Sequence, residues 1–93
     1  MEERKMKEII ETIIEDIPPG MVFDTHTIIE YLLQNYSDEY LQNCNGRTTL
    51  SYHGYIGQVI DGITKEGLVK RVGDSWSLNI HKRFSECACW QKL

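Results

Sequence analysis

Three cysteines and three histidines are the side chains of this sequence best suited to bind a metal ion. Cys87 and Cys89 are two residues apart, so on a β-strand both would project to the same side. With Cys44 and His81 they could form a Cys3His zinc site. However, C-x-C is not the usual spacing of a zinc knuckle, and Cys44 lies far from the other two in sequence. We therefore expect no metal ion and no cofactor, and interpret the cysteines as small buried hydrophobic residues.

Residues that catalyse reactions in enzymes form no diagnostic pattern here. His26, His53 and His81 have no partner at the spacing of a nucleophile and its base, and there is no glycine-rich phosphate loop or serine elbow. We expect the protein not to be an enzyme, and His53 to be a half-buried, hydrogen-bonded side chain. One other role for the cysteines stays open, because an odd cysteine near the C-terminus could link two subunits through a disulfide bond.

A stripe of polar side chains runs along residues 51–67, SYHGYIGQVIDGITKEG, where the apolar residues recur with helical spacing. On a helical wheel of about 100° per residue, the apolar side consists of Tyr52, Ile56, Val59, Ile60 and Ile63. The opposite side consists of Ser51, Gly54, Gln58, Asp61 and Lys65. Gly54 is therefore expected to be exposed. Gly57 and Gly62 lie beside the apolar side, where we expect neighbouring elements to approach closely.

Two helices are predicted ahead of this segment. The first covers residues 3–17, with one wide apolar stripe, and ends at Pro18-Pro19-Gly20. A short extended piece at 21–23 leads to a second helix, which runs to about Tyr36 and is capped by Asp24 or Thr25.

The rest of the helical region is predicted from its turn residues and caps. Residues 37–48 are polar and contain Asn-Gly, which predicts a short helical turn followed by a loop. The polar-striped helix then covers about 49–66, with Thr49 or Ser51 as its cap and Gly67 immediately after its end.

Residues 68–80, LVKRVGDSWSLNI, are two alternating runs joined by Gly73-Asp74, which predicts a β-hairpin with a two-residue turn. This pairing would place Val69 opposite Leu78, Arg71 opposite Trp76 and Val72 opposite Ser75, and would bury Val69, Trp76, Leu78 and Ile80. Arg71 is then expected to stack on Trp76. Residues 84–90, FSECACW, are predicted as a further strand or an extended tail.

Composition and charge limit the classes of protein that fit. The 93 residues are 41% hydrophobic and 26% charged, as in one ordinary globular domain, and no apolar run is long enough to span a bilayer. The N-terminus does not resemble a secretion signal, so we expect a cytoplasmic protein. The net charge is −4, but residues 1–40 have three bases and ten acids whereas residues 41–93 have seven bases and four acids. This asymmetry indicates either that the second part faces an anionic partner or that the charge of the solvated surface is simply uneven.

The order helix, short strand, helix, turn, helix, hairpin resembles that of the winged helix-turn-helix superfamily. The resemblance rests mainly on residues 54–78, GYIGQVIDGITKEGLVKRVGDSWSL. The resemblance implies an α+β, mainly α fold: a three-helix bundle with a C-terminal β-hairpin wing, in a single domain over residues 1–93. The sequence departs from the family in two ways. About a dozen residues separate the second and third helices, and the wing tip carries Asp74, which would repel a phosphate.

The resemblance also implies double-stranded DNA binding by a transcriptional regulator, with the 49–66 helix in the major groove and the 68–80 hairpin as the wing. The residues expected at the DNA are Arg47, Thr48, Thr49, Ser51, Gly54, Tyr55, Gln58, Lys65, Lys70, Arg71, Lys82 and Arg83. A homodimer is expected, because one small module buries too little surface for high specificity. The first helix either forms the dimer contact or completes the core, and CACWQKL, residues 87–93, is the second candidate contact. The alternative function is a protein-interaction module that does not bind DNA, which the negative net charge, Asp61 and Asp74 favour.

Overall fold

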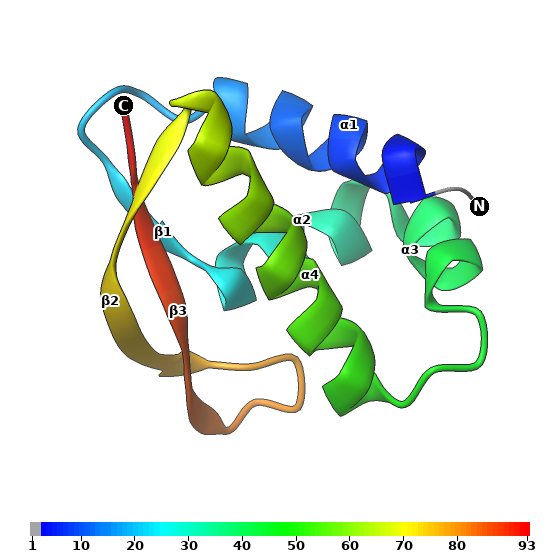
Figure 1. The fold of residues 1–93 in the computed structure, drawn as a ribbon. Helices are drawn as coiled ribbons and strands as arrows, with labels where there is room; N and C mark the ends of the chain where they lie inside the picture. The colour runs from blue at the N-terminus through cyan, green and yellow to red at the C-terminus, as the bar shows by residue number, and fades with distance from the viewer. Residues whose placement is uncertain (1–2) are drawn as a thin grey trace.

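The computed structural model describes residues 3–93 and places the helices to one side of a three-stranded sheet (Figure 1). In chain order the elements are α1 (Glu3–Glu15), β1 (Val22–Asp24), α2 (Thr25–Asn35), α3 (Ser37–Cys44), α4 (Thr49–Ile63), the 3-10 turn η1 (Thr64–Glu66), β2 (Val69–Leu78) and β3 (Phe84–Lys92). The strands form one antiparallel sheet in the order β1-β3-β2. The α+β, mainly helical class expected from the sequence is therefore confirmed. Within residues 3–93, no helix is long and apolar enough to cross a membrane.

The apolar stripe of α1 lies inside the molecule. Met6, Ile10 and Ile14 have no exposed surface, and Ile9 and Ile13 are buried as well, as the i, i+3, i+4 spacing predicts. Of the two roles expected for this stripe, the structure gives it the second, because it completes the core of the monomer. The C-terminal segment is also used internally, since residues 84–92 form the central strand of the sheet.

The helix starts agree with the sequence prediction at α2 and differ by one residue at α4. Asp24 caps α2, accepting a hydrogen bond at Oδ1 from the Thr27 N–H at 2.8 Å. The cap of α4 is Thr48, whose Oγ1 accepts from the Ser51 N–H at 3.2 Å, rather than Thr49 or Ser51. The predicted helical turn after α2 is a complete eight-residue helix, α3. Gly67 adopts a positive φ of 77° after η1, as expected of a glycine that follows a helix end.

The predicted hairpin turn at Gly73-Asp74 is wrong. β2 continues through both residues and pairs with β3 rather than with itself, so Val69 lies opposite Lys92 and Leu78 lies opposite Phe84. The register shifts between Arg71 and Gly73, and Gly73 has a φ of 136°. Gly73 therefore lies at a β-bulge. A β-bulge favours glycine for the same reason as a tight turn, because glycine readily adopts a positive φ.

The actual turn of this hairpin lies at residues 79–83 and is organised by Asn79. The Asn79 N–H donates to Arg83 O at 2.8 Å, and the Lys82 N–H donates to Asn79 O at 3.0 Å. The side-chain Oδ1 of Asn79 also accepts from the N–H groups of His81 and Arg83, at 2.9 and 3.3 Å. These four bonds fix the turn, and Lys82 within it has a positive φ of 63°.

The new register changes which aromatic residue enters the core. Trp76 was expected to be buried and is instead 68% exposed, and Leu78 is also exposed. Trp90 on β3 is completely buried in its place and stacks on Phe23, with 6.0 Å between ring centroids. The Arg71 guanidinium lies over Trp90, 5.7 Å from its centroid, and not over Trp76.

Trp90 also joins the sheet to α4 through its indole nitrogen. Nε1 donates to Asp61 Oδ1 at 3.1 Å, and Asp61 Oδ2 lies 3.5 Å from the Arg71 guanidinium. Arg71 makes a second ion pair, of 2.8 Å, with Asp74. The acid on the outer side of α4 is therefore a structural residue that holds the indole of the central strand.

Removing the Asp61 carboxylate should destabilise the protein. In Asp61→Ala the buried indole N–H loses its acceptor, and we expect the free energy of unfolding in urea to fall by about 1–2 kcal/mol. Asp74→Ala is the matched control, because it removes only an exposed ion pair, which contributes about 0–1 kcal/mol. Equal losses in the two variants would contradict the role given to Asp61.

Asp24 connects the start of α2 to the sheet by its carboxylate. Besides capping α2, it accepts at Oδ2 from Ser75 Oγ of β2 at 2.8 Å. Partial burial raises the pKa of this carboxyl, but the hydrogen bonds from Thr27 and from the serine hydroxyls of β2 outweigh burial. The net effect is a pKa below the ordinary value, so the charged form stabilises the fold.

Acid should weaken the fold partly through Asp24. A carboxyl whose pKa is lowered by folding contributes stability above its unfolded pKa of about 3.9, and loses it as the pH falls through the folded pKa. Asp24→Asn keeps a capping side chain but cannot titrate. Its free energy of unfolding, measured in urea, should therefore fall less on acidification than that of the wild type or of Asp38→Asn, an exposed control. The same acid loss in all three proteins would exclude this role.

Candidate nucleic-acid interface

α4 has one buried and one exposed side, as the sequence predicts. Tyr52, Ile56, Ile60 and Ile63 have no exposed surface, and Val59 is half-buried. The exposed side of the helix consists of Ser51, Gly54, Gln58 and Asp61. Since Asp61 is bonded to Trp90 and Arg71, the residues of this side left for a partner are Ser51, Gly54 and Gln58.

The three glycines of α4 differ less than expected. A methyl group at Gly54 or Gly62 would meet no atom within 4 Å, and one at Gly57 would lie 3.8 Å from Thr25 Oγ1, an ordinary contact. The close approach expected at Gly57 and Gly62 is therefore wrong. The exposure of Gly54 is confirmed.

The start of α4 presents a cation beside the N-terminus of the helix. The Arg47 guanidinium lies 4.4 Å from the centroid of Tyr55 and 5.9 Å from that of Tyr52, and the two tyrosines stack on each other. Tyr55 is half-buried by this packing. The first N–H groups of a helix carry a partial positive charge, so they and Arg47 together favour an anion.

The β2–β3 turn lies at the same end of the molecule as the start of α4 (Figure 1). Lys82 and Arg83 are exposed in this turn, and Arg47, Thr48, Thr49, Ser51 and Gly54 are exposed at the start of the helix. Seven of the residues expected at the DNA are thus brought to one end. α1, which carries Glu8, Glu11 and Glu15, runs along the opposite side of the molecule in Figure 1.

Three of the expected basic residues lie elsewhere. Lys65 is in η1 and Lys70 is near the start of β2, beyond the C-terminal end of α4, and both are exposed. A 15-residue helix is about 22 Å long, so these lysines are well separated from the start of α4. Arg71 is engaged by Asp61, Asp74 and the Trp90 ring.

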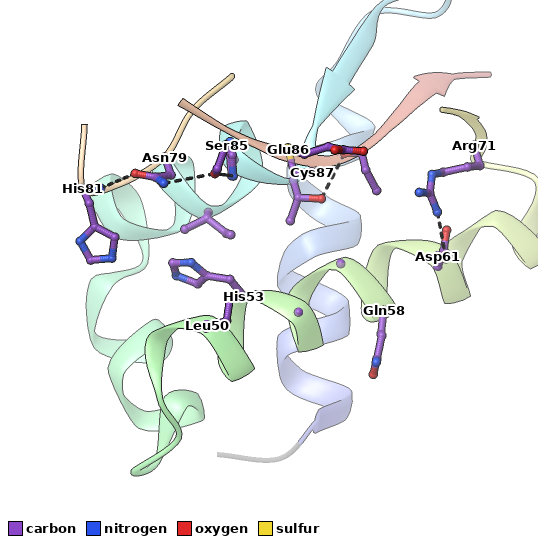
Figure 2. Close-up of a pocket in the computed structure, with 16 residues that line it drawn as sticks. Leu50, His53, Gln58, Asp61, Arg71, Asn79, His81, Ser85, Glu86 and Cys87 are labelled. Atoms are coloured by element: carbon purple, nitrogen blue, oxygen red, sulfur yellow. Dashed lines mark hydrogen bonds and ion pairs between the residues drawn. The ribbon is translucent and has the colours of Figure 1, made fainter. Parts of the chain in front are cut away.

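A cleft of about 420 Å³ lies between the outer side of α4, the start of α2 and the hairpin (Figure 2). Leu50 and Gln58 line it from α4, and the rings of His53 and His81 point toward each other across it (Figure 2). His26 completes the group from α2, with Nδ1 2.7 Å from Ser77 Oγ and Nε2 3.4 Å from Ser85 Oγ. Sequence reasoning missed this group, because only the pairing of β2 with β3 brings its members together.

His53 is half-buried and hydrogen-bonded, as predicted. Its Nε2 lies 2.7 Å from the Tyr40 hydroxyl. Burial, together with the nearby His26 and His81, lowers the pKa of His53 below its ordinary value, which favours the neutral ring.

The cysteines do not gather into one site. Cys89 is buried, whereas Cys44 and Cys87 are half-buried, and all three are free thiols. In the part of the chain that the structure describes, no three His, Cys, Asp or Glu side chains are arranged to hold a metal ion.

Comparison with known proteins adds no family to this description. No family model, curated protein or solved structure matches the chain.

Proposed function

We propose that this chain is a winged-helix domain that binds double-stranded DNA, with α4 in the major groove and the β2–β3 hairpin as the wing. The element order supports the proposal, because a short strand follows α1 and a two-stranded hairpin follows α4. The long segment between α2 and α4, which departs from the minimal pattern, contains the additional helix α3.

The observation that carries the proposal is the collection of positive charge at the start of α4. Arg47, Lys82 and Arg83 are exposed and belong to segments distant in sequence, and these segments, the start of α4 and the β2–β3 turn, lie at the same end of the molecule (Figure 1). The helix end adds its own partial positive charge there. Phosphate groups on either side of a major groove would meet this end, while α1, which carries Glu8, Glu11 and Glu15, runs along the opposite side of the molecule (Figure 1).

The exposed side of α4 supplies side chains able to contact base edges. Gln58 can form two hydrogen bonds with adenine, Ser51 can donate or accept, and Gly54 lets the backbone approach closely. Asp61 and Arg71 are left out of the proposed contacts, since their charges are used between α4 and the sheet. Lys65 and Lys70 would meet only DNA that extends along the full length of the helix.

A homodimer acting as a transcriptional regulator is part of this proposal. A single domain of this size presents one helix to the DNA, and specific recognition usually needs two such helices in successive grooves. The α1 stripe and β3 are used inside the monomer, so the dimer contact must come from other exposed residues.

The second candidate is a protein-interaction domain that does not bind DNA. The net charge of −4 favours it, as does the exposure of Trp76 and Phe84 on the hairpin, at 68% and 62%. The first candidate is preferred because three exposed cations, Arg47, Lys82 and Arg83, belong to the two segments at the end of the molecule where α4 begins.

Binding of fluorescently labelled random duplex DNA across a salt series tests the proposal. We expect affinity to fall steeply with salt, because phosphate contacts release counterions. Lys82→Ala and Arg83→Ala should each weaken binding and lower the slope of log affinity against log salt by about one. Lys5→Ala on α1 is the control and should change neither. Failure to bind DNA at low salt would leave the protein-interaction domain as the better candidate.

Two glycine substitutions separate helix stability from DNA contact. Gly54→Ala and Gly62→Ala both add a methyl group in open space, so each should raise the free energy of unfolding by about 0.5–1 kcal/mol. Gly54 lies between Ser51 and Gln58, in the part of α4 proposed to enter the groove, whereas Gly62 lies beyond it, so only Gly54→Ala should also weaken duplex binding. If the two variants bind duplex DNA equally well, the backbone at Gly54 is not in contact with it.

A further inference from the structure

Three apolar side chains form an exposed strip near the end of the β2–β3 hairpin. Leu78 and Phe84 lie directly opposite each other, and Trp76 is two residues before Leu78, so all three project from one face. Trp76 is 68% exposed, Phe84 is 62% exposed and Leu78 is 44% exposed. The three side chains of this hairpin strip do not contribute to the hydrophobic core, because the tryptophan that the sheet buries there is Trp90. Clustered exposed apolar residues usually mark a binding surface.

The opposite face of the hairpin is polar and is anchored to α2. Ser75 donates to Asp24 at 2.8 Å, and Ser77 Oγ lies 2.7 Å from His26 Nδ1. Ser85, opposite Ser77, lies 3.4 Å from His26 Nε2. These contacts hold the serine face inward, so the hairpin strip is held facing outward.

Positive charge lies at one end of the hairpin strip. Lys82 and Arg83 immediately precede Phe84, in the turn that the Asn79 side chain fixes. At the other end, Glu86 lies opposite Trp76, and Asp74 is paired with Arg71. The hairpin strip therefore offers a partner flat apolar rings, with cations on the turn side only. Such a surface is complementary to a ligand that has both flat apolar faces and anionic groups.

Nucleic-acid bases joined to phosphates have both of these properties. Aromatic side chains stack on bases in proteins that bind single strands, and neighbouring Lys and Arg contact the phosphates. In a fully paired duplex the faces of the bases are covered by their neighbours, so only an unstacked step offers them to Trp76 and Phe84. We propose that the hairpin strip stacks on bases at an unstacked or unpaired step, so that the protein prefers duplex DNA containing such a step. This inference rests on the proposed DNA-binding function.

Competition between two labelled duplexes of equal length tests the inference. One is fully paired, and the other has a short central run of mismatches. Since stacking on an aromatic side chain strengthens the binding of an unpaired base, we expect the wild type to bind the mismatched duplex about tenfold more tightly. Trp76→Ala and Phe84→Ala should bring the ratio of the two affinities close to one, whereas Trp76→Phe should retain most of it. Met21→Ala, which also removes an exposed apolar side chain, is the control and should leave the ratio unchanged.

Tryptophan fluorescence gives an independent readout. Trp76 is exposed and Trp90 is buried, so stacking of a base on Trp76 should quench part of the emission of the wild type. The quenching should be absent in Trp76→Phe. Urea unfolding of each variant checks that these surface substitutions leave the fold intact.

The possible results separate the inference from the function on which it rests. Salt-dependent binding with equal affinity for both duplexes, unaffected by Trp76→Ala, overturns the inference and leaves DNA binding in place. Failure to bind either duplex at low salt overturns both. Binding to phosphatidylserine vesicles without DNA binding, lost in Trp76→Ala, would assign the hairpin strip to an anionic bilayer and overturn the inference as well.

Discussion

The buried indole of Trp90 is the contact on which the arrangement of the sheet and helices depends. Its ring stacks on Phe23 of β1, its N–H bonds Asp61 of α4, and Arg71 of β2 lies over its face. One side chain of the central strand therefore contacts both edge strands and the helix proposed to enter DNA. Since the other tryptophan of the hairpin, Trp76, is exposed, burial of Trp90 in the core also selects the register in which β2 pairs with β3.

In that register, the C-terminal end of α4 is bonded to the sheet, whereas its N-terminal end is left for the proposed partner. At its C-terminal end, Asp61 is bonded to the sheet, and the nearby Arg71 is neutralised by two carboxylates. At its N-terminal end, Arg47, Thr48 and Thr49 are exposed, and the β2–β3 turn, which contains Lys82 and Arg83, lies at the same end of the molecule (Figure 1). The presence of acids on the outer side of α4 and on β2 therefore does not argue against an anionic partner, because those acids have partners within the fold.

The two faces of the hairpin are divided in a similar way. Serines on one face bond Asp24 and His26 at the start of α2, and apolar residues on the other face are left to solvent. The turn between the strands is fixed by Asn79 rather than by glycine. A hairpin held along one face and at its turn loses little conformational freedom on binding, which favours affinity for a partner of the opposite face.

The sequence by itself predicted α1, α2 and α4, a cap of α2 at Asp24 or Thr25, and the two sides of α4, because these depend on hydrogen bonds and periodicity among residues within a few positions of each other. It also showed that Gly54 faces outward and that the second part of the chain is basic. Only the tertiary structure decided the hairpin. Gly73-Asp74 is compatible with a turn or a bulge, and the choice depends on whether β2 pairs with its own continuation or with a strand that begins at Phe84. The burial of Trp90 instead of Trp76, the use of Asp61, the grouping of the histidines and the position of Lys82 and Arg83 all follow from that long-range pairing. Local sequence patterns do not contain it, because its energy comes from contacts between residues far apart in the chain.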